Sequence, residues 1–409
     1  MENLRDYVNE LKLRASYGEV GNQNGIGRYD GIQLYNYKSN SGALLGNSKG
    51  TYVESAGLVS TVRTWERIYN YNLGIDFGFF NNHLSGNVNY YINETRDLLI
   101  TRKLAPSAGL ANPTLNVGKM RNQGFELELN WNDKVSDFEY NVGFNLSTVS
   151  NKVVSLANED QTIYGMGLKY GSEHFPTQTK VGKPIGAFYL YQADGIFQSL
   201  EEVQAHKNSK GELLQPNAQP GDVRFKDMNG DGVIDEDDKT YSGTGIAKVE
   251  ANLNLSASYK GFDFSAVIGS AFGNKLYNGI RYYYEGMNSG SNFLKTTLNA
   301  WTPTNTKTDI PRAVFGDPNQ NTRESTRFLE NGDFVRLRQV QLGYTLPKAL
   351  SKHIYCESIR FYVSAENVFT ITGYSGANPE FSQGVLNSGI DRFTYPFSRS
   401  YTVGAQISF

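Results

Sequence analysis

The amino-acid sequence predicts an all-β fold, an antiparallel transmembrane β-barrel with long extracellular loops. Three observations support this prediction. Apolar and polar residues alternate over long stretches, the connections between these stretches are alternately short and long, and aromatic residues and glycine are abundant. The 409 residues include 27 Tyr, 23 Phe and 42 Gly, whereas all hydrophobic residues together make only 39%. Tyr and Trp suit the aromatic girdles of such barrels.

The alternation is regular in four segments, 69–79, 125–131, 138–147 and 249–259. In 125–131, for example, every odd position is Phe, Leu or Trp and every even position is Glu or Asn. A period of two residues indicates a strand with one apolar and one polar face. Strands of globular proteins usually have about 5–6 residues, whereas a tilted strand needs about 9–11 to cross a bilayer. The long runs therefore favour a membrane barrel over a soluble β-sandwich or propeller.

We predict about twelve strands, which would form part of a larger barrel. The strand at 173–181 is the least regular, because Pro176 interrupts it and proline cannot donate a hydrogen bond to a neighbouring strand. The predicted strands are 11–18, 67–79, 84–98, 120–131, 138–150, 173–181, 185–198, 247–259, 262–273, 333–346, 357–370 and 399–409.

The connections between these strands are alternately short and long. Outer-membrane barrels have this asymmetry, with short periplasmic turns and long external loops. We therefore predict that all six long connections lie on one side, that the first strand runs outward and that the last runs inward. The short connections include 80–83, 132–137, 182–184 and 260–261, and the long ones are 19–66, 99–119, 151–172, 199–246, 274–332 and 371–398.

The composition argues against several other classes of protein. With 39 Lys and Arg against 41 Asp and Glu, the chain lacks the basic excess of a nucleic-acid-binding protein, so we expect no nucleic acid partner. No window approaches the ~18 uncharged apolar residues of a membrane-spanning helix. Residues 1–14 are charged throughout and have no apolar core of a signal peptide. The single cysteine, Cys356, excludes an internal disulfide framework and a Cys-rich metal site.

Six segments, in order along the chain, resemble the SusC/RagA family of TonB-dependent transporters. Three of them are GKMRNQGFELEL (118–129), FLENGDFVRLRQVQLGYTLP (328–347) and RSYTVGAQISF (399–409), and the others are 86–100, 182–198 and 359–380. The resemblance implies a location in the outer membrane of Gram-negative Bacteroidota and the import of glycans or peptides. It also implies a SusD-like surface lipoprotein as partner and energy from the TonB–ExbB–ExbD complex.

The resemblance covers only part of a family member. Such proteins are about twice as long and carry a plug, a TonB box and a 22-stranded barrel, and no segment here is similar to the plug or the TonB box. We therefore expect residues 1–409 to be the C-terminal part of the barrel, in contact with outer-membrane lipid. The TonB complex would act through the N-terminal part that is missing here.

The segment 227–238, DMNGDGVIDEDD, has the spacing of a calcium-binding loop. Acidic or amide side chains take positions one, three, five, nine and twelve, glycine takes position six, and position seven offers a backbone carbonyl. Hard oxygen ligands favour Ca²⁺ over softer metals. We predict a structural calcium site within an extracellular loop insertion, 199–246; the alternative is an acidic turn without an ion. The predicted ligands are Asp227, Asn229, Asp231, Val233, Asp235 and Asp238.

The residues indicate no enzyme. The four histidines, His83, His174, His206 and His353, have no evident serine–carboxylate setting for nucleophilic catalysis. The sequence also lacks GxSxG and the phosphate-binding GxxxxGK[ST]. We therefore predict no catalytic or cofactor-binding residues.

Aromatic residues in the long loops are candidate binding groups. Aromatic faces beside Asn and Asp suit sugar stacking combined with hydrogen bonding. The alternative interpretation, packing at the rim or contact with a lid lipoprotein, is favoured. The candidates are Tyr164, Tyr170, Tyr282, Tyr283, Tyr284 and Trp301.

Two other functions stay open at this point. One is a self-contained, porin-like passive barrel, which ion conductance in bilayers would reveal. The other is a soluble, calcium-stabilised β scaffold or adhesion module, which would dissolve without detergent. The identity of the transported substrate is not readable from the residues.

Overall fold

An antiparallel sheet of eleven strands dominates the computed structural model, which describes residues 7–39, 42, 44–55, 59, 63–102, 107, 112–170, 172–288, 290, 292–353, 355–381 and 383–409. Ten strands follow one another across this barrel sheet, and β10 (Ser150–Ser155) pairs beside them with β8. In sheet order the ten are β1 (Val8–Asn22), β6 (Glu66–Phe79), β7 (Leu84–Thr101), β8 (Thr114–Val135), β9 (Phe138–Thr148), β19 (Val249–Tyr259), β20 (Phe262–Phe272), β23 (Phe334–Thr345), β24 (Ser358–Thr372) and β26 (Ser400–Ser408).

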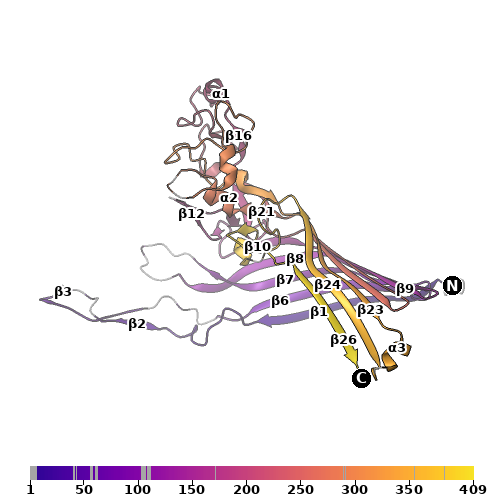
Figure 1. The fold of residues 1–409 in the computed structure, drawn as a ribbon. Helices are drawn as coiled ribbons and strands as arrows, with labels where there is room; N and C mark the ends of the chain where they lie inside the picture. Colours follow the sequence, from indigo (N-terminus) through magenta and orange to yellow (C-terminus); the bar gives the residue numbers. More distant parts are fainter. Residues whose placement is uncertain are drawn as a thin grey trace.

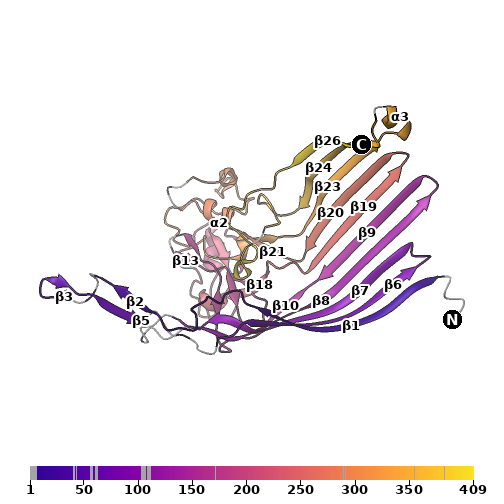
Figure 2. The same ribbon diagram turned by 90° about the horizontal axis from the view of Figure 1, so that it is seen from below.

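The barrel sheet is curved, with β1 and β26 at its two edges (Figure 2). Both chain ends lie at the same end of the strands, away from the long loops (Figure 1). At that end the strands are joined by short turns, one of which carries helix α3 (Lys348–His353). The predicted asymmetry of short and long connections and the direction of the first and last strands are thus confirmed.

Three long connections fold together into a second unit, which we call the loop domain (156–248, 273–333 and 373–399). Its elements include the sheet β11 (Ile163–Tyr164), β14 (Thr177–Thr179), β15 (Ala187–Leu190) and β18 (Thr240–Thr244), and the sheet β22 (Leu329–Asn331), β21 (Lys275–Asn278) and β25 (Ile390–Asp391). Smaller elements are the pairs β12 (Leu168–Tyr170) with β13 (Ser172–His174) and β16 (Ala193–Ile196) with β17 (Val223–Phe225), and helices α1 (Leu200–Ala205) and α2 (Gly279–Tyr284).

The loop domain has a hydrophobic core of its own, to which all three connections contribute. The core residues, each at most 1% exposed, are Leu168, Phe188, Leu190, Tyr277, Tyr282, Phe328 and Ile390. A further connection, 23–65, extends away from both units and contains the pairs β2 (Tyr35–Lys38) with β5 (Tyr52–Ser55) and β3 (Leu44–Leu45) with β4 (Ser48–Lys49) (Figure 1). Among the described residues, no helix combines the length and apolar character that a membrane span requires.

Two of the twelve predicted strands do not belong to the barrel sheet, and that part of the prediction was wrong. The segments 173–181 and 185–198 form short strands of the loop domain instead. Thr177–Thr179 is buried on both faces rather than on one, which a barrel strand between lipid and lumen would not be. Gly182 and Gly186, which both have positive φ, lie in the connection between β14 and β15. The predicted loops 151–172 and 199–246 are therefore parts of one excursion between β9 and β19.

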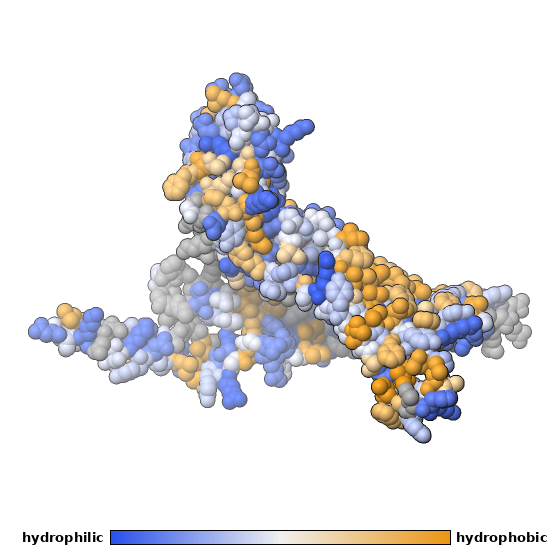
Figure 3. All heavy atoms as spheres, in the orientation of Figure 1, coloured by the Kyte–Doolittle hydropathy of each residue, from blue (hydrophilic) through white to orange (hydrophobic). Residues whose placement is uncertain are grey.

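The register confirms the predicted apolar and polar faces. Leu13, Ile75, Val88, Leu127 and Leu146 are successive cross-strand partners from β1 to β9, and therefore lie in one row on one face. Leu13 is 72% exposed, as expected of a side chain that faces lipid. Figure 3 shows hydrophobic residues gathered over the strands, whereas hydrophobic and hydrophilic residues are mixed over the loop domain.

An aromatic row marks the periplasmic edge of this lipid-facing face. Phe138, Tyr259, Phe262, Tyr344 and Phe361 are successive partners across β9, β19, β20, β23 and β24. The rings of Phe262 and Tyr344 lie 4.5 Å apart. Such a row is the interfacial girdle typical of outer-membrane barrels.

Candidate functional site

A polar cavity of about 710 Å³ lies within the loop domain, lined by residues of 273–333 and 373–399. Helix α2 supplies one wall with Arg281, and the residue after the helix, Glu285, continues it. Glu330 of β22 and Ser375 from the loop after β24 also line the cavity. Segments from two different connections thus meet here, which places charged groups together that are far apart in sequence.

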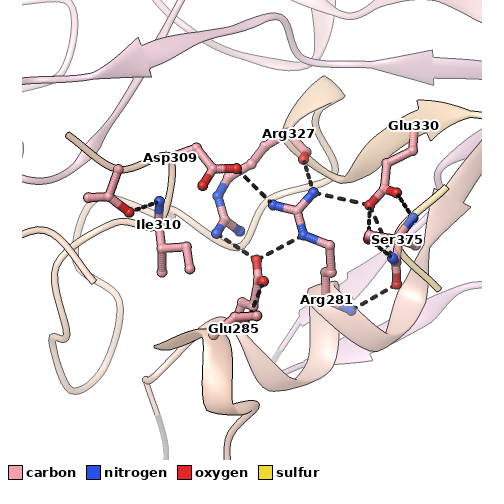
Figure 4. A network of polar contacts seen from close by, with 10 residues as sticks. Arg281, Glu285, Asp309, Ile310, Arg327, Glu330 and Ser375 are labelled. Carbon is pink, nitrogen blue, oxygen red and sulfur yellow. Dashed lines mark hydrogen bonds and ion pairs between the residues drawn. The ribbon is translucent and has the colours of Figure 1, made fainter. Parts of the chain in front are cut away.

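Arg281 is the centre of the ionic network in this cavity (Figure 4). Its Nε donates to Glu285 Oε2 at 3.0 Å, its Nη1 to Glu330 Oε1 at 3.1 Å and its Nη2 to Asp309 Oδ2 at 3.3 Å. Arg327 Nη2 donates to the same Glu285 oxygen at 3.0 Å. The two arginines face three carboxylates, so the network has a net charge of −1.

Local sequence explains how α2 presents these groups. Asn278 caps the helix by accepting a hydrogen bond from the Arg281 backbone N–H at 3.1 Å. Arg281 and Glu285 are four residues apart and therefore lie on the same face of the turn. Tyr282, on another face, enters the hydrophobic core and contacts His174 Nδ1 through its hydroxyl at 2.9 Å. Burial lowers the pKa of Arg327 to about 10, which still leaves it charged at neutral pH.

Most of the aromatic residues that the sequence marked as candidate sugar platforms serve packing instead. Tyr282 is fully buried, and Tyr283 and Tyr284 both pack against Phe393 at 5.6 Å. Trp301 is 8% exposed and donates from its indole nitrogen to Gln198 at 2.9 Å. The favoured alternative, packing at the rim, therefore holds for these four. The side chain of Tyr170 lies outside the described residues.

Tyr164 differs, because it is 42% exposed and borders a second, apolar cavity of about 560 Å³. This cavity lies between the extracellular ends of β7, β8 and β10 and the loop domain. Aliphatic residues such as Ile100, Met120 and Val153 form its barrel side, and Phe175 and Ile185 its loop side. The loop domain thus borders one charged cavity and one apolar cavity, which have no lining residue in common.

Arginine–aspartate pairs line the polar face of the barrel sheet, and glycine makes room for each. A Cβ atom at Gly343 would lie 2.6 Å from Arg360 Nη2, which donates to Asp263 at 2.5 Å. Any larger residue would therefore displace the pair. Sequence reasoning missed these pairs, although glycine at a polar-face position is a usable signal. The two sets are Gly343 with Arg360 and Asp263, and Gly74 with Arg14 and Asp76.

The predicted calcium ligands lie together in one turn of the loop domain. Both oxygens of Asp227 accept backbone hydrogen bonds, from Gly230 at 2.6 Å and Gly232 at 2.9 Å. Both oxygens of the buried Asp238 also accept backbone N–H groups, at 2.6 and 2.8 Å. Within the described ranges, no three His, Cys, Asp or Glu side chains are arranged to hold a metal ion. The acidic groups shape the turn, and calcium binding by Asp227, Asn229, Asp231, Val233, Asp235 and Asp238 stays a prediction.

We expect Ca²⁺ to slow proteolysis within 227–238 if the turn rearranges around the ion. At 100 times the dissociation constant, binding would stabilise the loop by about 2.7 kcal/mol. Limited proteolysis of the intact protein, with Ca²⁺ or with chelator, measures this. Asp231→Ala should abolish the protection, whereas Asp237→Ala, an exposed neighbour outside the ligand set, should keep it. Equal cleavage of all three proteins in both conditions would contradict a metal role.

Three of the four histidine rings contact backbone carbonyls, and the fourth contacts a tyrosine hydroxyl. His83 Nδ1 lies 2.7 Å from the Asn132 carbonyl, and His353 Nδ1 lies 2.7 Å from that of Ala349. His206 Nε2 lies 3.0 Å from the Phe225 carbonyl, and burial lowers the pKa of His206 below its usual value. These contacts give the histidines structural roles.

Nearly the whole chain is similar to known receptor barrels. Residues 3–368 match the family described as TonB dependent receptor-like, beta-barrel. TonB-dependent receptor P3 of Formosa agariphila is 29% identical over 411 residues, which are 98% of this chain and 40% of that protein. TonB-dependent receptor SusC of Bacteroides thetaiotaomicron is 26% identical over 98% of this chain and 38% of its own length. The chain thus spans about 40% of the length of these curated relatives.

Solved structures show the same likeness. The structure of the RagAB peptide transporter superimposes with a TM-score of 0.77 and 25% identity, over 99% of this chain and 41% of that chain. The RagAB peptide importer in its closed-closed state gives a TM-score of 0.76 at 25% identity, over 98% and 41%. The similarity therefore includes the loop domain as well as the barrel sheet.

Proposed function

We propose that this chain forms part of the wall and of the extracellular mouth of an outer-membrane nutrient importer, because it belongs to the family of TonB-dependent receptor-like β-barrels. It is a SusC/RagA-like receptor-barrel segment of the outer membrane, and not an enzyme. The observation that carries the proposal is the folded loop domain at the extracellular end, with its two cavities. A pore that only lets solutes diffuse through does not require binding cavities at its extracellular end.

The proposed substrates are glycans or peptides. The ionic groups around Arg281 and the aliphatic wall around Ile100 support a ligand that has both polar and apolar parts. A peptide offers this combination through its side chains and backbone, and a glycan through hydroxyl groups and the apolar faces of its rings. Both classes therefore stay in the proposal, and an uptake assay must include both.

We further propose a SusD-like surface lipoprotein as partner of the mouth. Leu298 and Phe315, both in the loop domain, are each 83% exposed. Apolar side chains with that exposure fit a protein contact. We also propose coupling to TonB–ExbB–ExbD, which is supported by the match to TonB-dependent receptor-like barrels.

The test is uptake by cells that carry or lack the gene. Deletion should abolish accumulation of a labelled glycan or peptide mixture, and deletion of tonB should have the same effect. Leu298→Asp combined with Phe315→Asp should reduce co-purification of a surface lipoprotein, whereas Lys134→Asp, at the periplasmic end of β8, should not. Accumulation that persists without TonB, together with steady ion conductance in bilayers, would support the porin-like alternative instead.

A further inference from the structure

Basic side chains gather on the lipid-facing side of the barrel sheet, at the extracellular ends of β6, β7, β8 and β10. We call the set Arg67, Arg96, Lys119, Arg121 and Lys152 the cationic patch. Cross-strand register places them together: Arg67 pairs with Arg96, Arg96 with Lys119, and Arg121 with Lys152. Arg67 lies on the face of β6 that also carries Tyr71, Leu73 and Ile75. The patch is therefore on the outer side of the wall, not in the lumen.

A single buried carboxylate organises the centre of the patch. Glu94 accepts hydrogen bonds from Arg96 Nε at 2.9 Å and Arg121 Nη2 at 2.7 Å, and Lys119 Nζ lies 2.8 Å from it. The Glu94 side chain is only 6% exposed, whereas those of Arg96 and Arg121 are 40% and 43% exposed. The negative charge is thus covered by the cations, and the surface that solvent meets is positive.

The patch keeps a positive excess after its ion pairs are counted. Arg67 pairs with Asp97 at 2.7 Å and lies 3.7 Å from Glu19. The five cations therefore face three carboxylates, which leaves a net charge of +2. Lys152 is exposed and makes no ion pair with any described residue.

The level of the patch is that of lipid head groups. An aromatic row of Tyr17, Tyr71, Tyr90 and Phe125 lies just below it, with Tyr17 and Tyr71 5.2 Å apart and Tyr90 and Phe125 4.8 Å apart. From Phe79, at the periplasmic end of β6, to Tyr71 the strand rises about 27 Å at ~3.4 Å per residue. With a tilt of 35–45° this gives about 20 Å of height, close to the apolar band of such barrels.

The cationic patch does not continue onto the neighbouring strands β19, β20, β23 and β24. At the extracellular ends of β19, β20, β23 and β24 the same face carries Val249, Phe272, Val335 and Ile371. A general preference of barrel rims for cations would not produce this difference. The arc is also interior to the barrel sheet, since β1 lies beyond β6.

We propose that the cationic patch binds the phosphate group of a glycolipid in the outer leaflet of the outer membrane. Phosphate oxygens would accept hydrogen bonds from the exposed arginine groups, whose planar donor sets match phosphate geometry. The acyl chains would lie on the apolar face below, between Tyr71 and Phe125. This continuity with the lipid-facing surface favours a lipid over an acidic protein partner, which would need no aromatic row beneath it.

Binding of lipid A to the detergent-purified protein tests the proposal, with dephosphorylated lipid A as the matched ligand. Removal of one basic residue near an anionic lipid surface lowers affinity about five-fold. We therefore expect Lys152→Gln, which breaks no ion pair with a described residue, to weaken binding of lipid A by that factor. Lys119→Gln combined with Arg121→Gln should weaken it about 25-fold. Native mass spectrometry measures the bound fraction.

Controls separate phosphate recognition from general adhesion of lipid. Lys134→Gln, at the opposite end of β8, should bind lipid A like the wild type. Higher salt should weaken the binding of lipid A to the wild type more than its binding to the double variant. Equal binding of both forms of lipid A would overturn the proposal. Patch variants that bind lipid A like the wild type would also overturn it. So would patch variants that lose a co-purifying protein while their binding of lipid A is unchanged.

Discussion

Arginine in place of Leu253 should lower the free energy of unfolding of the membrane-inserted protein by about 2–4 kcal/mol, the cost of a guanidinium on the lipid face near the bilayer midplane. Leu253 lies in the middle of β19, and its cross-strand partners are Phe144 and Ile268. All three are apolar and share one face, so a charged side chain here would have neither water nor a partner ion.

The neighbouring Asn254 provides the matched control, because it lies on the opposite, lumenal face. Its partners are Gly143 and Val267, and glycine leaves space for a longer side chain. Asn254→Arg should therefore change stability much less than Leu253→Arg. Urea-induced unfolding from lipid vesicles compares the two. Equal destabilisation by both variants would contradict the assignment of faces, and with it the position of the cationic patch.

The barrel strands could be predicted because their signal is local and long. In β19 the alternation continues over all eleven residues, and the predicted segments 247–259 and 262–273 differ from the observed strands by two residues or fewer. A strand that separates lipid from a polar lumen must show this pattern. The same requirement explains why the apolar and polar faces were assigned correctly from sequence.

The loop domain could not be predicted in the same way, because its contacts join distant segments. β21 pairs in parallel with β25, so that Tyr277 faces Ile390, and strands of two to four residues show no period. Pro176 argues against a barrel strand at 173–181. Short segments that are buried on both faces nevertheless resemble interrupted barrel strands in sequence.

The candidate site was missed for the same physical reason. Arg281, Arg327, Glu330 and Ser375 come from separate positions, and no spacing in the sequence relates them. The acidic turn at 227–238 was visible because its spacing is local, yet the spacing alone does not decide between an ion and backbone N–H groups as partners of the carboxylates. Its calcium stays a prediction that proteolysis can test.

Alanine in place of Glu285 should destabilise the loop domain by about 3–5 kcal/mol, because it leaves a buried cation without its partner. The Glu285 side chain is 3% exposed and that of Arg327 is 6% exposed. Arg281 keeps Glu330 as a partner at 3.1 Å, so the missing carboxylate mainly affects Arg327. The loop domain should then be cleaved by protease at a lower temperature, while the barrel sheet stays intact.

Asp309→Ala serves as the control for a lost carboxylate in the same network. Asp309 pairs with Arg281 at 3.3 Å but its side chain is 81% exposed, and exposed pairs contribute about 0–1 kcal/mol. The double variant Glu285→Leu with Arg327→Met should recover much of the stability, since it removes both buried charges together. Thermal proteolysis of all four proteins gives the comparison. If protease cleaved Glu285→Ala and Asp309→Ala at the same temperature, the buried pair Glu285–Arg327 would not stabilise the cavity wall. The stability of the loop domain would then depend on the hydrophobic core around Tyr282 and Phe328 alone.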